Sequence, residues 1–429
     1  MKFIDTFKLL SFTKVNIFLI AFLPLSLLIG SLINNLIVIL ITIIFLLDCK
    51  FRNNFYIFKE KNFIFLLIIW LYLVFNSFYV GETTDSIIRA IGYIRFFILA
   101  YAIFFYLNIE KKLYEKKILK YWVFLFLVVS IDLIIESIFG RNMLGYAAIY
   151  PARLASFTGD ELKIGGYYFG FISLTSAFFY NYNKRFFIFY FITFFILSLL
   201  IGERANFIKI FLIYLMFVFT ILETSKLKKS IVLMFLCLMT VLIISNVGGF
   251  KSKFYNQVFN KVNKADKISL QKFKPEELVK NLHLSHYYTA INIFKENPIF
   301  GIGLKEFRIE SKKKKYSPIK NAYGLGMHPH QVHFEILAEL GIVGYLLIIS
   351  NVIYVMFNLF KTDKKNNILI KSSIIFVIVT FVPIIPSGSF FTTYGATIYW
   401  INYSLLITGL VKKKNFNKIF SNNGKIKKL

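Results

Sequence analysis

Apolar residues occur along this chain in long blocks, whereas amphipathic helices and strands of soluble proteins alternate apolar with polar positions. Blocks of roughly 20 apolar residues match the hydrocarbon thickness of a bilayer. A backbone in lipid must satisfy its own hydrogen bonds, so each block is predicted to be a helix. Twelve blocks occur, over residues 15–30, 32–47, 63–80, 87–107, 121–139, 164–179, 186–201, 206–222, 231–245, 334–360, 368–385 and 391–410. The pattern predicts an all-α integral membrane protein of about twelve transmembrane helices.

One connection between blocks is far longer than the others. Residues 248–333 separate the ninth and tenth blocks, and a loop of this length usually has its own structure or function. Within it, residues 286–295 have the pattern of a short amphipathic helix, ended by an Asn-Pro pair at 297–298. The predicted organisation is helices 1–9 over residues 1–247, the loop 248–333, helices 10–12 over 334–410 and a basic tail over 411–429.

The charge distribution orients these helices. The chain carries a net charge of +29, but most of its lysines lie in short loops between apolar blocks, so we do not expect a nucleic-acid partner. With both termini in the cytoplasm, the lysine-rich short loops are cytoplasmic, and the short outer loops carry few basic residues, among them Arg141, Arg153 and Arg204. This asymmetry is the positive-inside pattern. It predicts that the long loop, which crosses a membrane regardless of its charge, lies on the outer face.

All five histidines lie in the long loop. His328, His330 and His333 fall within six residues immediately before the tenth block, and His283 and His286 precede them. The first three are therefore predicted at the outer mouth of a transmembrane helix. Histidine exchanges a proton near neutral pH, whereas a zinc site needs further ligands at fixed spacing that are absent here. The residues alone support a catalytic histidine and a water-facing interfacial cluster about equally.

Two arginines are candidates for binding phosphate, which a guanidinium group contacts bidentately. Arg204 stands between the seventh and eighth blocks, at their outer ends, where it either snorkels to the interface or binds substrate. Arg95 lies deep in the fourth block, where a charge should face the bundle interior or a wet cavity. Asp132 and Glu136 share one helix face in the fifth block. They either pair with Arg95 or frame a headgroup cavity.

The segment before and within the tenth block carries a recognisable spacing. His330-Gln331 is followed by nine residues and then by Gly341-Ile-Val-Gly344. This resembles the signature of O-antigen ligases, in which His and then Asn, Ser or Gln precede Gly-x-x-Gly by nine residues. Glu339-Leu-Gly341 and the upstream Asn-Pro-Ile-Phe-Gly-Ile-Gly at 297–303 also match. The two glycines are interpreted as a small face that lets another helix approach closely.

The resemblance extends to the layout of twelve helices with one long outer loop, and so covers nearly the whole chain. It implies a GT-C-like glycosyltransferase architecture in the bacterial inner membrane, surrounded by membrane lipids, with the active site on the periplasmic face. The implied reaction is transfer of a glycan from undecaprenyl diphosphate to a sugar hydroxyl of the lipid A core. Neither a cofactor nor a metal is implied.

The resemblance also implies roles for individual residues. His330 would be the catalytic base, with His328 and His333 as competing or supporting histidines. Arg204, where family members carry an arginine, would hold the diphosphate together with Arg308 or Arg95. The family's second arginine falls on a histidine here, so its place would be taken by one of three residues: His283, His286 or Arg308.

Two other functions are compatible with these features. An O-antigen polymerase uses the same donor but extends another lipid-linked glycan, and the spacing from His330 to Gly341 and Gly344 favours the ligase over it. A transporter or flippase of lipid-linked sugars would be expected to show internal repeats and broken helices near mid-membrane. The chain shows no internal repeat, and its polar residues gather at the outer surface, which favours an enzyme.

Overall fold

The computed structural model describes residues 2–109, 113–147, 153–159, 163–246, 282–313, 315–316, 326–362, 366–411 and 419. Within these ranges the chain forms helices and no sheet strand. Residues 248–281 of the predicted outer loop and nearly all of the basic tail 411–429 lie outside the described residues.

Each of the twelve predicted blocks falls on a described helix, except the block 87–107, which falls on two. Those of the first half are α1 (Lys2–Ile29), α2 (Ser31–Phe51), α3 (Lys61–Tyr79), α4 (Thr84–Gly92), α5 (Ile94–Asn108) and α6 (Leu113–Phe139), with 3-10 turns η1 (Phe55–Lys59) and η3 (Ser156–Thr158). Those of the second half are α7 (Ile164–Tyr182), α8 (Lys184–Leu200), α9 (Arg204–Thr220), α10 (Lys226–Asn246), α14 (Leu282–Glu296), α15 (Phe307–Glu310), α16 (Val332–Phe360), α17 (Ile368–Thr380) and α18 (Thr393–Leu410). The helix predicted over 286–295 is α14.

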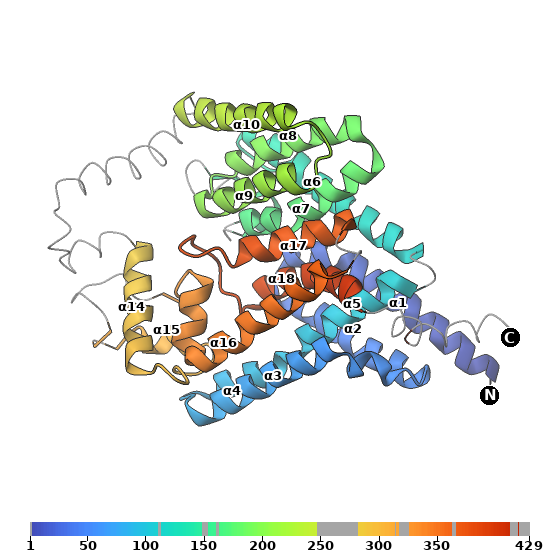
Figure 1. Cartoon of the computed structure of the whole chain (residues 1–429), viewed down its shortest axis with the longest axis vertical. Helices are drawn as coiled ribbons and strands as arrows, with labels where there is room; N and C mark the ends of the chain where they lie inside the picture. Colours follow the sequence, from blue (N-terminus) through green and yellow to red (C-terminus); the bar gives the residue numbers. More distant parts are fainter. Residues whose placement is uncertain are drawn as a thin grey trace.

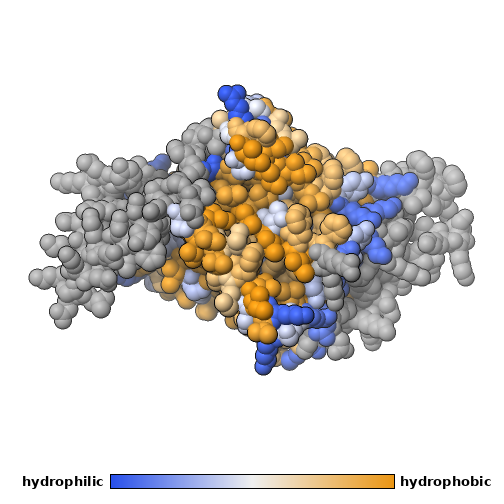
Figure 2. Space-filling model, turned by 90° about the horizontal axis from the view of Figure 1, so that it is seen from above, coloured by the Kyte–Doolittle hydropathy of each residue, from blue (hydrophilic) through white to orange (hydrophobic). Residues whose placement is uncertain are grey.

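Seven of the described helical segments are long and apolar enough to cross a membrane, and α8 and α17 are shorter apolar helices. Large apolar side chains such as Leu71, Met234 and Phe357 are exposed on them. Figure 2 shows apolar residues covering the middle of one face of the molecule, with hydrophilic residues toward its margins. A surface of this kind is stable against lipid and not against water. The chain is therefore an all-α integral membrane protein, as predicted.

The helices are arranged so that the two ends of the bundle differ. Helices α14 and α15 and the start of α16 lie at one end, opposite the end where α1 begins (Figure 1). In the bundle, α5 packs along α18, and α7 packs against α8, α9 and α17. Helix α14 packs on α16. The histidine-bearing segments are thereby brought to one end of the bundle.

Two predicted blocks are shorter or less regular than expected. The fourth block consists of α4 and α5, which meet at Tyr93. The eleventh was predicted to run to residue 385, but α17 ends at Thr380, and residues 381–392 are not helical. Pro383 and Pro386 lie in this segment, and a proline supplies no N–H to continue a helix. The resulting loop becomes part of the candidate site.

Helix α16 is broken at Gly341, whose φ of 65° lies outside the helical region. Segment 297–303 binds to the exposed backbone at the break. The N–H of Ile302 donates to the carbonyl of Ala338 at 3.1 Å, and the N–H of Ile342 donates to the carbonyl of Pro298 at 2.8 Å. The two motifs that carry the resemblance thus interlock through their backbones.

The interpretation of the two motif glycines as one small face is wrong for Gly341. A Cβ there would lie 2.3 Å from the carbonyl oxygen of Ile299, so this glycine permits a positive φ and a close approach of the loop backbone. Gly344 does have the predicted role, because a Cβ there would lie 2.8 Å from the ring of Tyr72 on α3. One glycine serves loop packing and the other helix packing.

Candidate functional site

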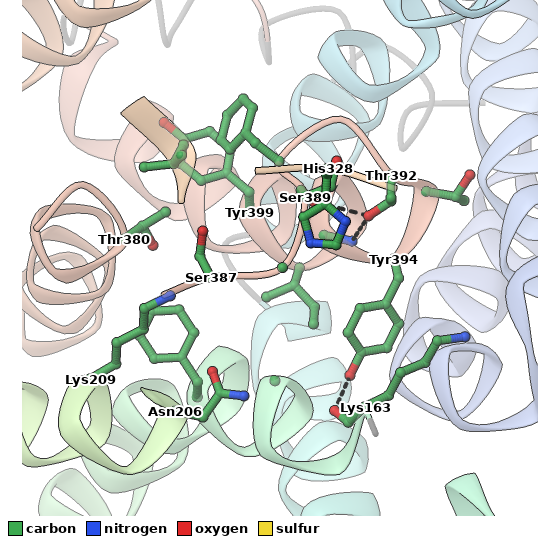
Figure 3. Close-up of a pocket in the computed structure, with 18 of the residues that line it drawn as sticks. Lys163, Asn206, Lys209, His328, Thr380, Ser387, Ser389, Thr392, Tyr394 and Tyr399 are labelled. Atoms are coloured by element: carbon green, nitrogen blue, oxygen red, sulfur yellow. Dashed lines mark hydrogen bonds between the residues drawn. The ribbon is translucent and has the colours of Figure 1, made fainter. Parts of the chain in front are cut away.

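A cavity of about 500 Å³ lies among α7, α9, α17 and α18 (Figure 3). Its wall is completed by residues of the 381–392 loop and by His328, just before α16. Hydroxyl groups line much of it, from Ser31, Thr380, Ser387, Ser389, Thr392, Thr393, Tyr394 and Tyr399. The cavity therefore offers many neutral hydrogen-bonding groups to a polar ligand.

The charges lining this cavity have one sign. Arg89, Lys163 and Lys209 line it, and the part of the chain that the structure describes contributes no aspartate or glutamate to the lining. Cations gathered without carboxylates around one space attract anions. The cavity is suited to a ligand that carries negative charge.

Four histidines from two separate segments meet beside the cavity. The ring centroid of His330 lies 4.0 Å from that of His328, 5.1 Å from that of His286 and 5.4 Å from that of His283. His283 and His286 come from α14, which packs on α16. The structure thus brings together four of the five histidines singled out in the sequence.

Burial keeps these histidines neutral. It lowers the pKa of His330 to about 3, assisted by the neighbouring His328, and that of His328 to about 4, assisted by the charge of Lys305. Burial also lowers the pKa of His286 and of His283. Uncharged imidazoles at neutral pH can accept protons. Among the residues that the structure describes, no group of three or more His, Cys, Asp or Glu is arranged to hold a metal ion.

The backbone at His330 is held in an unusual conformation. Its φ is 58°, in the left-handed region, and its carbonyl oxygen accepts a 2.7 Å hydrogen bond from the N–H of Ser387. The next residue, Gln331, caps α16 by accepting a 3.0 Å hydrogen bond from the N–H of Phe334 through its side chain. Such strained residues persist where the surroundings fix them, and they cluster at functional sites.

The fifth histidine has a different environment. The two ring nitrogens of His333 lie 3.1 Å from the hydroxyl of Tyr345 and 2.9 Å from the carbonyl oxygen of Phe381. Both nitrogens are therefore engaged within the helical bundle. His333 lies outside the group of four.

The 381–392 loop is fixed against α16 by a buried polar network that the sequence did not suggest. The ammonium of Lys305 donates to the hydroxyl of Ser389 at 2.6 Å and lies 3.4 Å from a carboxylate oxygen of Glu335. That carboxylate also accepts hydrogen bonds from the Ser389 hydroxyl and from the N–H of Phe390, the latter at 2.8 Å. The side chains of Lys305, Glu335 and Ser389 are all buried. The network positions the loop as a wall of the cavity.

Arg204 is the first residue of α9 and is half-buried. Its charge and that of Arg153 help to lower the pKa of His283, so both guanidinium groups lie near the histidine group. Arg204 does not line the cavity, but Asn206 does. Arg153 was noted in the sequence for its outer-loop position and was not proposed for the site.

The other two candidate arginines are engaged elsewhere. Arg308 on α15 pairs with Asp85 on α4, and Asp85 also binds the guanidinium of Arg89 at 2.8 Å. Arg95 donates to the carbonyl of Gly92, and its guanidinium carbon lies 4.5 Å from the ring centroid of Phe96. Neither Arg308 nor Arg95 lines the cavity.

Pairing of Asp132 and Glu136 with Arg95 was one of the two alternatives from the sequence. The structure does not show this pairing. Asp132 accepts a 2.6 Å hydrogen bond from the N–H of Met143, and Glu136 accepts one of 3.0 Å from the N–H of Ala155. They therefore anchor the connection between α6 and α7. The loop backbone, and not Arg95, supplies their hydrogen-bond donors.

Lys163 and Lys209 line the cavity, and neither was predicted from the sequence. A signal for Lys209 was present, because it is a lone lysine in an apolar block, and such residues mark functional sites in membrane proteins. Lys163 precedes α7 in a polar segment. Lysines are common in such segments, so its position gave no signal of a functional role. Only the folding of α7 against α9 reveals that the two lysines share a cavity.

Residues 168–349 match the family model described as O-antigen ligase. The match runs from α7 into α16 and includes Arg204, Lys209 and the four grouped histidines. No curated protein matches the chain significantly. The matched segment carries the grouped histidines and Arg204, whereas Arg89, Lys163 and the 381–392 loop of the cavity wall lie outside it.

Proposed function

We propose that this chain, whose residues 168–349 match the O-antigen ligase family model, transfers a glycan from undecaprenyl diphosphate to a sugar hydroxyl of the lipid A core. The family comprises membrane enzymes of the ligase or polymerase type. One observation carries the proposal for this chain: a group of four neutral histidines adjoins a cavity lined by cations. A lipid-linked diphosphate is an anion with an activated leaving group.

The proposed reaction is a direct displacement at the anomeric carbon of the donor sugar. The acceptor hydroxyl forms a bond to this carbon, the bond from carbon to the diphosphate oxygen breaks, and the diphosphate leaves with the electron pair. His330 accepts the hydroxyl proton as general base. The donor occupies the cavity next to His328, and the acceptor reaches the half-buried His330 from outside it.

A bound diphosphate also makes His330 a stronger base. In the free enzyme, burial lowers the pKa of His330 to about 3, so the ring is neutral but a weak base. Negative charge placed nearby stabilises the imidazolium form and raises that pKa. The base thus gains strength when the donor is bound.

Arg204 is proposed to hold the diphosphate and to stabilise the charge that develops on it as it leaves. Its position near His283 supports this role, since the charge of Arg204 helps to lower the pKa of His283. Arg308 is proposed to act indirectly. It pairs with Asp85, which also binds Arg89, and so it helps to position the guanidinium of Arg89 at the cavity. We assign Arg95 no part in the reaction.

We propose that the protein lies in the bacterial inner membrane, with both termini in the cytoplasm and the site on the periplasmic face. The basic short loops support this orientation. So does the position of α14 at the end of the bundle opposite the start of α1 (Figure 1).

The test is transfer by the purified protein in vesicles, with a polyprenyl diphosphate-linked glycan as donor. Two acceptors are compared: lipid A core, and a second molecule of lipid-linked glycan. Glycosylated lipid A core is the expected product. Products lengthened only on the lipid-linked acceptor would identify a polymerase, and no glycosidic product from either acceptor would contradict the proposal.

A further inference from the structure

Lys209 is a buried cation that the mechanism above does not use. Its side chain is 4% exposed, although it lies in the apolar helix α9. It makes no hydrogen bond or ion pair with any residue that the structure describes, and its ammonium lies 5.2 Å from the ring centroid of Phe169. Figure 3 shows the side chain extending from α9 into the cavity, between Asn206 and Ser387.

Burying an ammonium group without a counter-ion is strongly unfavourable. The two other cations of the cavity are already engaged: Arg89 binds Asp85 at 2.8 Å, and the ammonium of Lys163 donates to the hydroxyl of Ser31 at 3.3 Å. Lys209 has no equivalent contact. An intramembrane charge of this kind generally marks a ligand site, and an anion that enters the cavity would supply the partner that Lys209 lacks.

The position of Lys209 along α9 indicates which part of an anionic lipid it meets. It is five residues beyond Arg204, about 7.5 Å along the helix axis from the residue whose charge acts on His283 of α14. Apolar side chains of Phe169, Phe376 and Ile398 line the same cavity. A headgroup held there would have its sugar directed toward the histidines and its hydrocarbon chain among apolar side chains.

We propose that Lys209 binds the lipid-side phosphate of the diphosphate donor and so selects polyprenyl diphosphates over other membrane lipids. This inference rests on the proposed function and assigns the donor a second cation, distinct from Arg204. A methionine at position 209 would fill the same volume without charge, whereas an arginine would keep the charge.

The experiment measures equilibrium binding to the purified full chain in phosphatidylcholine nanodiscs. The probes are undecaprenyl diphosphate, undecaprenyl monophosphate, phosphatidylglycerol and inorganic diphosphate. Lys209→Met and Lys209→Arg are compared with Lys371→Met, a matched control whose half-buried lysine on α17 donates to the carbonyl of Thr220 and does not line the cavity. We expect Lys209→Met to lower the affinity for undecaprenyl diphosphate at least tenfold and Lys209→Arg to retain part of this affinity. Lys371→Met should bind undecaprenyl diphosphate as the wild type does.

Thermal unfolding without added probe separates binding from a structural role. Removing an unpaired buried charge should leave the melting temperature of Lys209→Met unchanged or raise it. A lower melting temperature, with unchanged affinity for undecaprenyl diphosphate, would make Lys209 a structural residue and overturn the inference.

The remaining outcomes separate this inference from the proposed function. Wild-type affinity in Lys209→Met, with transfer intact, would overturn the inference and leave the proposed function standing. A Lys209-dependent preference for phosphatidylglycerol or for free inorganic diphosphate would overturn the assignment to a polyprenyl diphosphate. If the wild type binds no polyprenyl diphosphate and transfers no glycan, the proposed function itself fails.

Discussion

The imidazole ring of His328 lies 4.0 Å from that of His330, between ring centroids, and of the four grouped histidines only His328 lines the cavity. His330 therefore stands one side chain away from the cation-lined space. This arrangement suits a donor held in the cavity and an acceptor that arrives from outside. It also makes His328 the main competitor for the role of base.

The pH dependence of transfer should show the lowered histidine pKa values. A histidine with its ordinary pKa of 6.5 would lose half of its base form at that pH, whereas His330, with a pKa of about 3, stays neutral well below it. We expect kcat/KM, which reports the free enzyme, to have no acid limb near pH 6.5. The acid limb of kcat should lie at higher pH than that of kcat/KM, because bound diphosphate raises the pKa of His330.

Initial rates between pH 5 and 8, over a range of donor concentrations, check this prediction. An acid limb of kcat/KM centred near pH 6.5 that persists in both His328→Ala and His333→Ala would show that the essential base titrates as an ordinary histidine. The buried site would then not control its pKa.

Arg204→Ala should lower transfer by roughly 100-fold or more, since it removes charge that stabilises the leaving diphosphate. Arg204→Lys should restore only part of the rate, because an ammonium cannot contact two phosphate oxygens in the fork geometry of a guanidinium. The measurement is kcat/KM with purified donor and acceptor, beside the expression level of each variant. Full activity in Arg204→Ala would remove this residue from the site.

Gly341→Ala should destabilise the fold. The residue has a φ of 65°, and an added Cβ would lie 2.3 Å from a backbone oxygen of the 297–303 segment. Such strain costs about 1–3 kcal/mol before any displacement of the loop. Gly388→Ala is the matched control for stability, because a Cβ there meets no atom within 4 Å. Equal melting temperatures for the two variants would show that the break in α16 tolerates a side chain.

The positions of the helices could be predicted because the length of an apolar block is set by the bilayer and is visible in the sequence. The break in α16 could not, since a glycine in an apolar block fits a packing face as well as a kink. Gly341 and Gly344 look alike in the sequence, and only the approach of Ile299 and Tyr72 separates them.

The candidate site was predicted in part. Three histidines within residues 328–333 suggested one cluster, but the direction of each ring depends on where the helix starts, and His333 points to Tyr345 and Phe381 instead. The meeting of His283 with His330 depends on how α14 packs, which no spacing encodes. Lys209 was missed, although it is a lone lysine in an apolar block and could have been found by that pattern.

The proposed orientation predicts the behaviour of fused reporters. A reporter that is active only in the cytoplasm should be active when fused after Leu429 or inserted within residues 111–120, and silent when inserted within 312–315. The reason is the excess of basic residues in the segments assigned to the cytoplasm. The opposite pattern of activity would reverse the orientation and move the site to the cytoplasmic face.

The assignment of His330 as the general base is tested by the turnover of the purified wild type and of His330→Ala, His328→Ala and His333→Ala, with defined donor and acceptor and a chelator present. Loss of a general base typically lowers a rate by about 10²–10⁴-fold. We predict that loss for His330→Ala with donor binding retained, and turnover close to wild type for His333→Ala. Near-normal turnover in His330→Ala, with His328→Ala inactive, would contradict the assignment of the base. Arrest of the wild type by the chelator alone would replace the general base with a metal site.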